Sequence, residues 1–343
     1  MHDQSIAIGI IGTGGMGGSH VLNLTHHVVG SRIVALCDVD QARLESLARE
    51  VGKPRLYTDP FALIEDPSVE AVIVASPDAT HAQYVLHALS FGKPVFCEKP
   101  LAATEKDALA ILLKETEIGK KMVSVGFNRR FDPWHQKLKE EVASKAYGLP
   151  LLWKGFHRNP SAMYNTDGPF ILNNSAGHDV DCVRWVLDSP IVEVHCCGIR
   201  SRLSLPDDAR DLLIVNMLLE NGSRAIAEVY VNASYGYEVG LEVVCQEGTV
   251  STLPIERTFV RNKARKGVAV SDDFRAYFAD SYLFEIQDWV NSLLSGSPFK
   301  GADAWDGYAA LVITEAAGKS LTQGKPIRPA FEKMPALYRR ETP

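Results

Sequence analysis

The sequence predicts an α/β protein, with a doubly wound parallel sheet in its first part and a second α/β region that carries a large, mostly antiparallel open sheet. Short β-branched runs alternate with longer amphipathic runs from residue 5 to about residue 126, which is the pattern of repeated strand–helix–strand units. Several long strands then follow one another after residue 190, which indicates an antiparallel sheet. We therefore expect two domains, residues 1–126 and 127–343.

The first part contains five short apolar runs that predict strands, at 6–11, 33–37, 71–75, 94–97 and 122–126. Amphipathic helices are expected between them, near 15–28, 40–51, 78–91 and 104–118. Thr104 opens the last of these helices and is a good N-cap residue.

The second part begins after Asp132-Pro133 with a helix over about 133–145, a strand over 151–157 and a helix that starts near Ser175. Five strands follow, at 191–199, 211–219, 224–231, 237–245 and 249–253, with a hairpin turn over 220–223. Two helices, at about 280–295 and 303–321, close the chain. The helices suffice to cover one face of this sheet, so we expect a homo-oligomer, with a tetramer favoured over a dimer.

Composition excludes several classes of protein. The 36 Lys and Arg residues are scattered among 42 Asp and Glu residues, which gives no sign of nucleic-acid binding. No apolar run approaches the roughly 20 residues of a membrane span, and the first run is too short for a secretion signal. The six cysteines form no CxxC pair and are expected to be buried thiols. We expect a cytoplasmic protein that does not bind membranes.

A GxGxxG pattern follows the first strand and opens the first helix. At such a position, backbone N–H groups and the helix dipole can bind a pyrophosphate, whereas the alternative is a plain tight turn. The residues of this loop are Gly12, Thr13, Gly14, Gly15, Met16 and Gly17.

Asp38 ends the second strand, about twenty residues after the loop, where a carboxylate accepts hydrogen bonds from ribose hydroxyls. A carboxylate there repels a 2′-phosphate, Val39 follows it, and the next arginine is Arg43. NAD is therefore predicted as the cofactor in preference to NADP. The alternative role for Asp38 is that of a helix N-cap.

Two further segments follow strands at the same edge of the sheet. Ser76, Pro77 and His81 are expected to line the nicotinamide side, with ordinary loop chemistry as the alternative. The tripeptide Glu98-Lys99-Pro100 follows the strand at 94–97, and a fixed ammonium beside a nicotinamide indicates alcohol oxidation. A lysine after a strand is otherwise most often a solvated charge.

Together with this fingerprint and tripeptide, the string from Gly177 to Asp181 resembles the glucose-fructose oxidoreductase/inositol dehydrogenase (Gfo/Idh/MocA) family of NAD(P)-dependent sugar dehydrogenases. The likeness extends over nearly the whole chain. Longer strings, at 127–132, 157–160, 235–238 and 304–308, are most similar to those of inositol 2-dehydrogenases.

The resemblance implies an N-terminal Rossmann domain, a C-terminal α/β domain with an open sheet used in oligomer contacts, and a cyclitol or sugar substrate. It also implies that the Lys99-Pro100 peptide is cis, that Lys99 and His178 are the catalytic pair and that Asp181 contacts substrate. The residues implied to line the pocket are Arg129, His157, Asn159, Tyr237 and Tyr282. Tyr235 is the alternative to Tyr237. Glu98 and Arg129 are also expected to contact the cofactor, and no metal is expected.

Two positions depart from the family. Asn174 stands four residues before His178, where inositol dehydrogenases carry an aspartate, and Gly177 replaces a bulkier apolar residue. An aspartate would hold one imidazole tautomer and stabilise the imidazolium, whereas Asn174 carries no charge. Asp181 and Asp179 are the candidates to supply the missing carboxylate.

Oxidation of a secondary alcohol needs a base near neutrality, which favours His178, and a charge beside the developing alkoxide, which favours Lys99. If Asn174 cannot support the imidazole, a desolvated Lys99 of lowered pKa is expected to share the proton transfer. The predicted reaction is NAD-dependent oxidation of a cyclitol, with myo-inositol or another inositol isomer as substrate. An aldose or pyranose dehydrogenase, a non-catalytic NAD-binding regulator and an NAD-dependent glycosidase are the alternatives. Four further histidines are expected to be surface or packing residues: His20, His26, His27 and His87.

Overall fold

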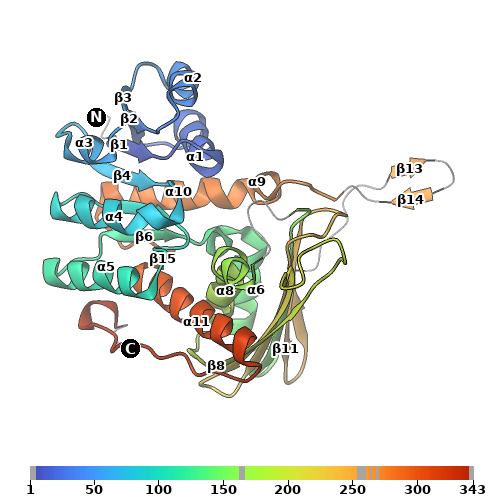
Figure 1. Ribbon diagram of the computed structural model, residues 1–343. Helices are drawn as coiled ribbons and strands as arrows, with labels where there is room; N and C mark the ends of the chain where they lie inside the picture. Colours follow the sequence, from blue (N-terminus) through green and yellow to red (C-terminus); the bar gives the residue numbers. More distant parts are fainter. Residues whose placement is uncertain (1–4, 162–166, 253–259, 263–264, 268–269, 340–343) are drawn as a thin grey trace. The chain divides into compact units, whose positions relative to one another are not determined.

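The computed structural model describes residues 5–161, 167–252, 260–262, 265–267 and 270–339 (Figure 1). By contacts, the chain forms two compact units. The first contains Met1–Phe131, Asp280–Leu311 and Phe331–Pro343, and the second contains Asp132–Ala279 and Val312–Ala330. Neither unit is one continuous stretch, so the linear division into functional domains at residue 126 stays a prediction.

A seven-stranded sheet forms the centre of the first unit, in the order β15-β6-β5-β4-β1-β2-β3. Six of its strands are parallel, and β15 runs antiparallel to β6 at one edge. The doubly wound parallel sheet is therefore confirmed, while β3 and β15 were not predicted. The strands are β1 (Ile6–Ile11), β2 (Ser31–Cys37), β3 (Arg55–Tyr57), β4 (Ala71–Val74), β5 (Val95–Glu98), β6 (Val123–Gly126) and β15 (Ala302–Asp303).

Helices cover both faces of this sheet. On one face, Ile8 and Ile10 of β1 join a buried cluster with Val21 of α1 and Trp289 of α10. Gly9 points to the opposite face, because neighbours alternate along a strand, and a Cβ atom there would lie 2.7 Å from Leu63 of α3. The helices are α1 (Gly15–His26), α2 (Gln41–Val51), α3 (Pro60–Glu65), α4 (His81–Ser90), α5 (Glu105–Ile118) and α10 (Ala279–Ser295).

The second unit contains a six-stranded sheet in the order β12-β11-β7-β10-β9-β8. Only β7 and β10 pair in parallel, so the prediction of a mostly antiparallel sheet is confirmed. The strands are β7 (Pro150–Arg158), β8 (Ile191–Ile199), β9 (Leu212–Leu219), β10 (Arg224–Tyr230), β11 (Glu238–Cys245) and β12 (Thr249–Ser251). A separate small hairpin joins β13 (Val260–Asn262) to β14 (Arg265–Gly267), and residue 253, the expected end of the last strand, lies outside the described residues.

The turn between β9 and β10 is the predicted hairpin. Leu219 N–H donates to the Ser223 carbonyl at 3.0 Å, and Gly222 has a φ of +86°, which a glycine adopts without strain. Along β9, buried residues alternate with half-buried ones. One face of the sheet is therefore covered and the other is open.

The helices of the second unit are α6 (Pro133–Ala143), α7 (Gly168–Ile171), α8 (Gly177–Leu187), α9 (Phe274–Tyr277) and the part of α11 (Ala304–Gln323) from Val312 onward. Helices α6 and α8 lie side by side, and α8 packs against β7 (Figure 1). None of the helices in the described part of the chain is long and apolar enough to cross a membrane.

The helix that was expected to start near Ser175 is α8, which begins at Gly177, and further helical segments that were not predicted precede it. Helix α7 starts at Gly168, and a π-helical segment, Leu172–Ala176, connects it to α8. Asparagine and serine side chains compete for backbone hydrogen bonds, and Asn173, Asn174 and Ser175 lie where the winding changes.

Candidate active site

The glycine loop joins β1 to α1. Gly12 has a φ of +86°, and a Cβ atom on it would lie 2.5 Å from the Ala75 carbonyl oxygen. A Cβ atom on Gly17 would lie 1.8 Å from the Gly12 carbonyl oxygen, so both positions require glycine. Gly14 caps α1 without a side chain, and a Cβ atom there would meet only Arg43 Nη1, at 3.7 Å. The first backbone N–H groups of α1 are thus open to an anion.

Asp38 supports this loop directly. Its Oδ2 accepts hydrogen bonds from the backbone N–H of Thr13 at 2.7 Å and from the Thr13 hydroxyl at 2.8 Å, and its Oδ1 accepts from Asp40 N–H at 2.9 Å. The N-cap of α2 is Asp40, whose side chain accepts from Arg43 N–H, so Asp38 does not have that alternative role. Burial would raise the pKa of Asp38, but these hydrogen bonds and Arg43 hold it below its ordinary value.

These residues fit a dinucleotide such as NAD. An open helix N-terminus suits the pyrophosphate, and an ionised carboxylate at the end of β2 suits ribose hydroxyls. Arg43 lies 3.6 Å from Asp38 Oδ2 and 3.2 Å from Asp40 Oδ2, so two carboxylates occupy its guanidinium. Val39 is exposed beside them.

The segment after β4 carries Ser76, Pro77 and His81. The Ser76 hydroxyl contacts the Thr80 hydroxyl at 2.7 Å. His81 is buried, and its Nε2 lies 2.8 Å from the Ser76 carbonyl while its Nδ1 lies 2.7 Å from the Pro100 carbonyl. Both ring nitrogens face backbone carbonyls, which favours a positioning role for His81 over the predicted contact with cofactor.

Lys99 follows β5, at the edge of the sheet where the parallel strands end. The Lys99-Pro100 peptide is cis, as the resemblance implied. Burial lowers the pKa of Lys99 below its ordinary value, the carboxylates of Glu98 and Asp78 raise it in part, and Arg129 lowers it further. Arg129 is buried in the 3₁₀ turn Asn128–Phe131.

Sequence reasoning missed the partner of Glu98. His20 was expected to be a surface or packing residue, but its side chain is fully buried and its Nε2 lies 2.7 Å from Glu98 Oε1. The available signal was helical spacing, because Gly17, His20 and Leu24 share the buried face of α1.

In the second unit, the predicted residues around His178 come together. His178 lies in the first turn of α8, directly after the π-helical segment that holds Asn174. Its ring lies 6.2 Å from that of His157, between centroids, and the ring of Tyr237 lies 5.9 Å from that of His157. Asn159 Nδ2 is 3.4 Å from His157 Nε2.

The carboxylates of α8 are both buried. Asp179 was a candidate partner for His178, but the structure pairs its Oδ2 with His157 Nδ1 at 3.3 Å. Asp181 lies one helical turn beyond His178, on the same face. Gly177 is not required by the backbone, since a Cβ atom there would meet only the Leu172 carbonyl, at 4.0 Å.

Burial separates the two tyrosine candidates. Tyr237 is 4% exposed and Tyr235 is 55% exposed, which favours Tyr237 for a binding role. Tyr282 is buried in α10 and, like Arg129, belongs to the first unit. Within the described ranges, no cluster of three or more histidine, cysteine or acidic side chains is placed to hold a metal ion.

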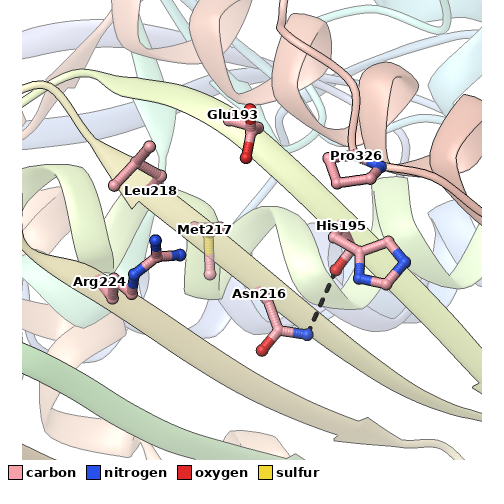
Figure 2. Close-up of a pocket in the computed structure, with 7 residues that line it drawn as sticks. All are labelled: Glu193, His195, Asn216, Met217, Leu218, Arg224 and Pro326. Carbon is pink, nitrogen blue, oxygen red and sulfur yellow. Dashed lines mark hydrogen bonds between the residues drawn. The ribbon is translucent and has the colours of Figure 1, made fainter.

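A hollow of about 310 Å³ lies elsewhere, on the open face of the second sheet (Figure 2). Glu193 and His195 of β8 stand directly across from Leu218 and Asn216 of β9, so these side chains share that face. The hollow does not contain the predicted site residues; it is lined by Glu193, His195, Asn216, Met217, Leu218, Arg224 and Pro326.

Comparison with known families gives two matches that together span nearly the whole chain. Residues 6–127 match an oxidoreductase family with an NAD-binding Rossmann fold, and residues 120–328 match the C-terminal alpha/beta domain of the same family. Their agreement with the two sheets confirms the predicted fold class.

Individual relatives cover the full length. The chain is 41% identical over 338 residues to the inositol 2-dehydrogenase of Rubrobacter xylanophilus, covering 98% of this chain and 97% of the relative. It is 39% identical over 336 residues to inositol 2-dehydrogenase 1 of Saccharopolyspora erythraea, covering 98% and 99%.

Two solved structures are similar as well. The Lactobacillus casei myo-inositol dehydrogenase in complex with NAD(H) and myo-inositol has a TM-score of 0.92 at 30% identity, covering 98% of this chain and 100% of that one. The scyllo-inositol dehydrogenase of the same organism, with bound NAD(H) and scyllo-inositol, has a TM-score of 0.88 at 26% identity, covering 94% and 99%.

Proposed function

Because the chain belongs to the GFO/IDH/MocA oxidoreductase family, we propose that it is an NAD-dependent inositol dehydrogenase, which oxidises one secondary hydroxyl of the ring to a ketone. The observation that carries the proposal is Lys99, a half-buried cation of lowered pKa held at the same edge of the sheet as the glycine loop. Inositol 2-dehydrogenases at 41% and 39% identity support an inositol as substrate, and the similar Lactobacillus casei enzyme solved with myo-inositol makes myo-inositol the first isomer to test.

The first unit would hold the cofactor. The N–H groups at the start of α1 would bind the pyrophosphate, and Asp38 would bind a ribose. The segments that His81 connects, at Ser76 and Pro100, would flank the nicotinamide. When bound, NAD supplies the hydride acceptor.

Two side chains of the protein act on the reacting hydroxyl: one accepts its proton and the other stabilises the negative charge that develops on its oxygen. The imidazole of His178 takes the proton of the reacting hydroxyl, a task that suits histidine as a residue type. The Lys99 ammonium stabilises the oxygen that loses this proton. Burial lowers the pKa of Lys99, and we assign it a share of the proton transfer.

Other side chains would recognise the ring hydroxyls. His157, Asn159 and Tyr237 gather next to His178, and Asp181 follows on α8. Polar groups that read hydroxyls discriminate strongly between isomers, because a wrong isomer leaves them without partners. Arg129 and Tyr282 of the first unit are assigned to the same task.

Assembly is part of the proposal. The open face of the second sheet presents Ile199, 52% exposed, and Ile226, which is 37% exposed and pairs with Asn216 of the hollow. Covering it with a second copy would bury these side chains, so we propose a homo-oligomer, a tetramer rather than a dimer. The six cysteines, all within the described part of the chain, form no disulfide, which fits the reducing cytoplasm as the proposed location.

The test is a substrate panel. Purified protein is mixed with NAD or NADP and with myo-inositol, scyllo-inositol, other cyclitols or free aldoses, and nicotinamide absorbance is followed. We expect NADH to form with a cyclitol and NAD. Turnover of aldoses alone would favour a pyranose dehydrogenase, as the altered positions Asn174 and Gly177 allow, and no turnover at all would contradict the proposal.

A matched variant tests the base. His178→Ala should lower kcat by about 100-fold or more while NAD binding changes little, as loss of a positioned base predicts. His87→Ala, on the surface of α4, is the control and should leave kcat unchanged. A His178→Ala variant within a few fold of wild type would exclude histidine as the base.

A further inference from the structure

We propose that His20 is a positioning residue that holds the Glu98 carboxylate against the backbone of Lys99, and so links helix α1, which begins at the glycine loop, to the reacting ammonium. The link affects catalysis only if Lys99 has the role given above, so it rests on the proposed function. The contact itself lies wholly within the first unit.

The pair is shielded from water. The side chain of His20 is 0% exposed and that of Glu98 is 8% exposed, and the Nε2 to Oε1 distance is 2.7 Å. The ring of His20 packs edge-on against Phe96, with centroids 5.7 Å apart. A charge-assisted hydrogen bond in such surroundings is stronger than one at the surface.

The other carboxylate oxygen of Glu98 faces the catalytic segment. Glu98 Oε2 accepts from the backbone N–H of Lys99 at 3.3 Å. A Cβ atom on Gly126 of β6 would lie 2.9 Å from the same oxygen, so a glycine at this position leaves room for the carboxylate. Helix α1, strand β6 and the Lys99 backbone thus fix Glu98 from three sides.

The electrostatic interactions of Glu98 involve the same two residues, His20 and Lys99, as its hydrogen bonds. Burial would raise the pKa of Glu98, but the hydrogen bond from His20 and the charges of His20, Lys99 and His81 hold it below its ordinary value. His20 therefore keeps Glu98 ionised. An ionised Glu98 in turn opposes the fall in the pKa of Lys99 that burial causes.

Two further charged groups act on Lys99 from other elements. Asp78, in the 3₁₀ turn before α4, raises the pKa of Lys99, and Arg129, in the turn after β6, lowers it. The hydrogen bond of His20 joins it to Glu98, so a change at His20 acts on Lys99 through Glu98. Without the His20 donor, the pKa of Lys99 should fall.

The experiment compares two substitutions of nearly equal shape. His20→Met removes the donor, whereas His20→Gln retains an amide N–H that can reach Glu98. The ligand-free full chain carries lysine labelled with ¹³C at Cε, and the Lys99 signal is identified by its loss in Lys99→Arg. Titration of this signal measures the pKa of Lys99 without any turnover.

We expect His20→Met to lower the pKa of Lys99 by about one unit or more, and His20→Gln to restore most of that shift. Glu98→Gln, which removes the carboxylate charge, should lower it in the same direction. His26→Met, on the exposed side of the same helix, is the control and should leave the titration unchanged. In turnover assays, the pH limb that Lys99 sets should move to lower pH by the same amount.

The outcomes separate this link from the proposed function. An unchanged Lys99 titration in folded His20→Met and in Glu98→Gln overturns the link. If His20→Met does not fold, as judged by thermal unfolding, an unchanged titration in Glu98→Gln alone overturns it. A shifted titration in a protein that oxidises no cyclitol supports the link while the proposed function fails.

Discussion

Asp179 Oδ2 lies 3.3 Å from His157 Nδ1, and both side chains are buried. The carboxylate next to His178 in the sequence therefore orients a second histidine. His178 and His157 then have different tasks: His178 removes the proton, and His157, held by Asp179, is assigned to substrate binding.

Asp179→Asn should weaken substrate binding more than it slows the chemical step. The amide can donate to the Nδ1 atom and favour the other tautomer of His157, which would misdirect the Nε2 atom near Asn159. We expect the KM for inositol to rise about tenfold and kcat to stay within a few fold. Steady-state kinetics on Asp179→Asn, with Asp208→Asn in an exposed loop as the control, measure this; a fall in kcat alone would contradict it.

Asn174→Asp should keep or increase the rate on cyclitols near neutral pH. A carboxylate four residues before His178 would stabilise the imidazolium that forms when the base accepts its proton. We expect kcat between that of wild type and about tenfold above it. The neighbouring Asn173→Asp is the control for added charge. Complete loss of activity in Asn174→Asp alone would show that Asn174 contacts substrate itself.

Asp38→Asn should raise the KM for NAD by about tenfold and reduce the preference over NADP, because the amide neither repels a 2′-phosphate nor accepts from ribose as strongly. The lowered pKa of Asp38 means that its carboxyl group is ionised at neutral pH in the wild-type protein. Asp40→Asn is a matched control, since asparagine caps a helix as well as aspartate does. Equal KM values for NAD in Asp38→Asn and wild type would exclude Asp38 from the cofactor site.

Glu115 offers a test of stability. This buried carboxylate accepts from the backbone N–H groups of Met122 and Val123 and from the hydroxyl of Tyr338, which fastens the C-terminal segment to the first unit. Burial raises the pKa of Glu115 above its ordinary value. Its contribution to stability is therefore full below the pKa of the unfolded chain and is lost as the pH rises through the folded-state pKa.

Glu115→Gln removes the charge and keeps the hydrogen bonds, since the amide oxygen accepts and its N–H donates to the Tyr338 oxygen. We expect a higher Tm than wild type at about pH 8 and a difference that shrinks toward about pH 4. Glu115→Ala, which leaves the N–H donors without an acceptor, should lose about 2 kcal/mol or more at both values. A Tm difference between Glu115→Gln and wild type that is smaller at about pH 8 than at about pH 4 would contradict this.

Local patterns predicted most of the fold. The apolar run Ile6–Ile11 became β1 and Ile191–Ile199 became β8 with the expected bounds, because each is a long run bounded by clear turns. Strands β3 and β15 have only three and two residues, too few to show a period. The π-helical segment Leu172–Ala176 carries two asparagines and a serine, which occur in turns as well as at helix ends, so the sequence did not predict its change in winding.

Some features of the candidate site could likewise be predicted from the sequence, and others could not. The glycine loop, Asp38 and the cis peptide after Lys99 could be predicted, because short motifs or a family resemblance carry them. The contacts of His20 with Glu98 and of Asp179 with His157 could not, since the partners are 78 and 22 residues apart. Such pairs depend on how strands and helices pack, which periodicity does not encode.

The most direct test of the central claim follows the hydrogen that leaves the substrate. The purified protein is incubated with NAD and myo-inositol deuterated on its ring carbons, and the reduced cofactor is analysed by mass spectrometry. An inositol dehydrogenase should yield one ketone and one NADH that carries one deuterium, at a lower rate than with unlabelled inositol. Reduced cofactor without deuterium, or no reduced cofactor with any inositol isomer, would contradict hydride transfer from the inositol ring.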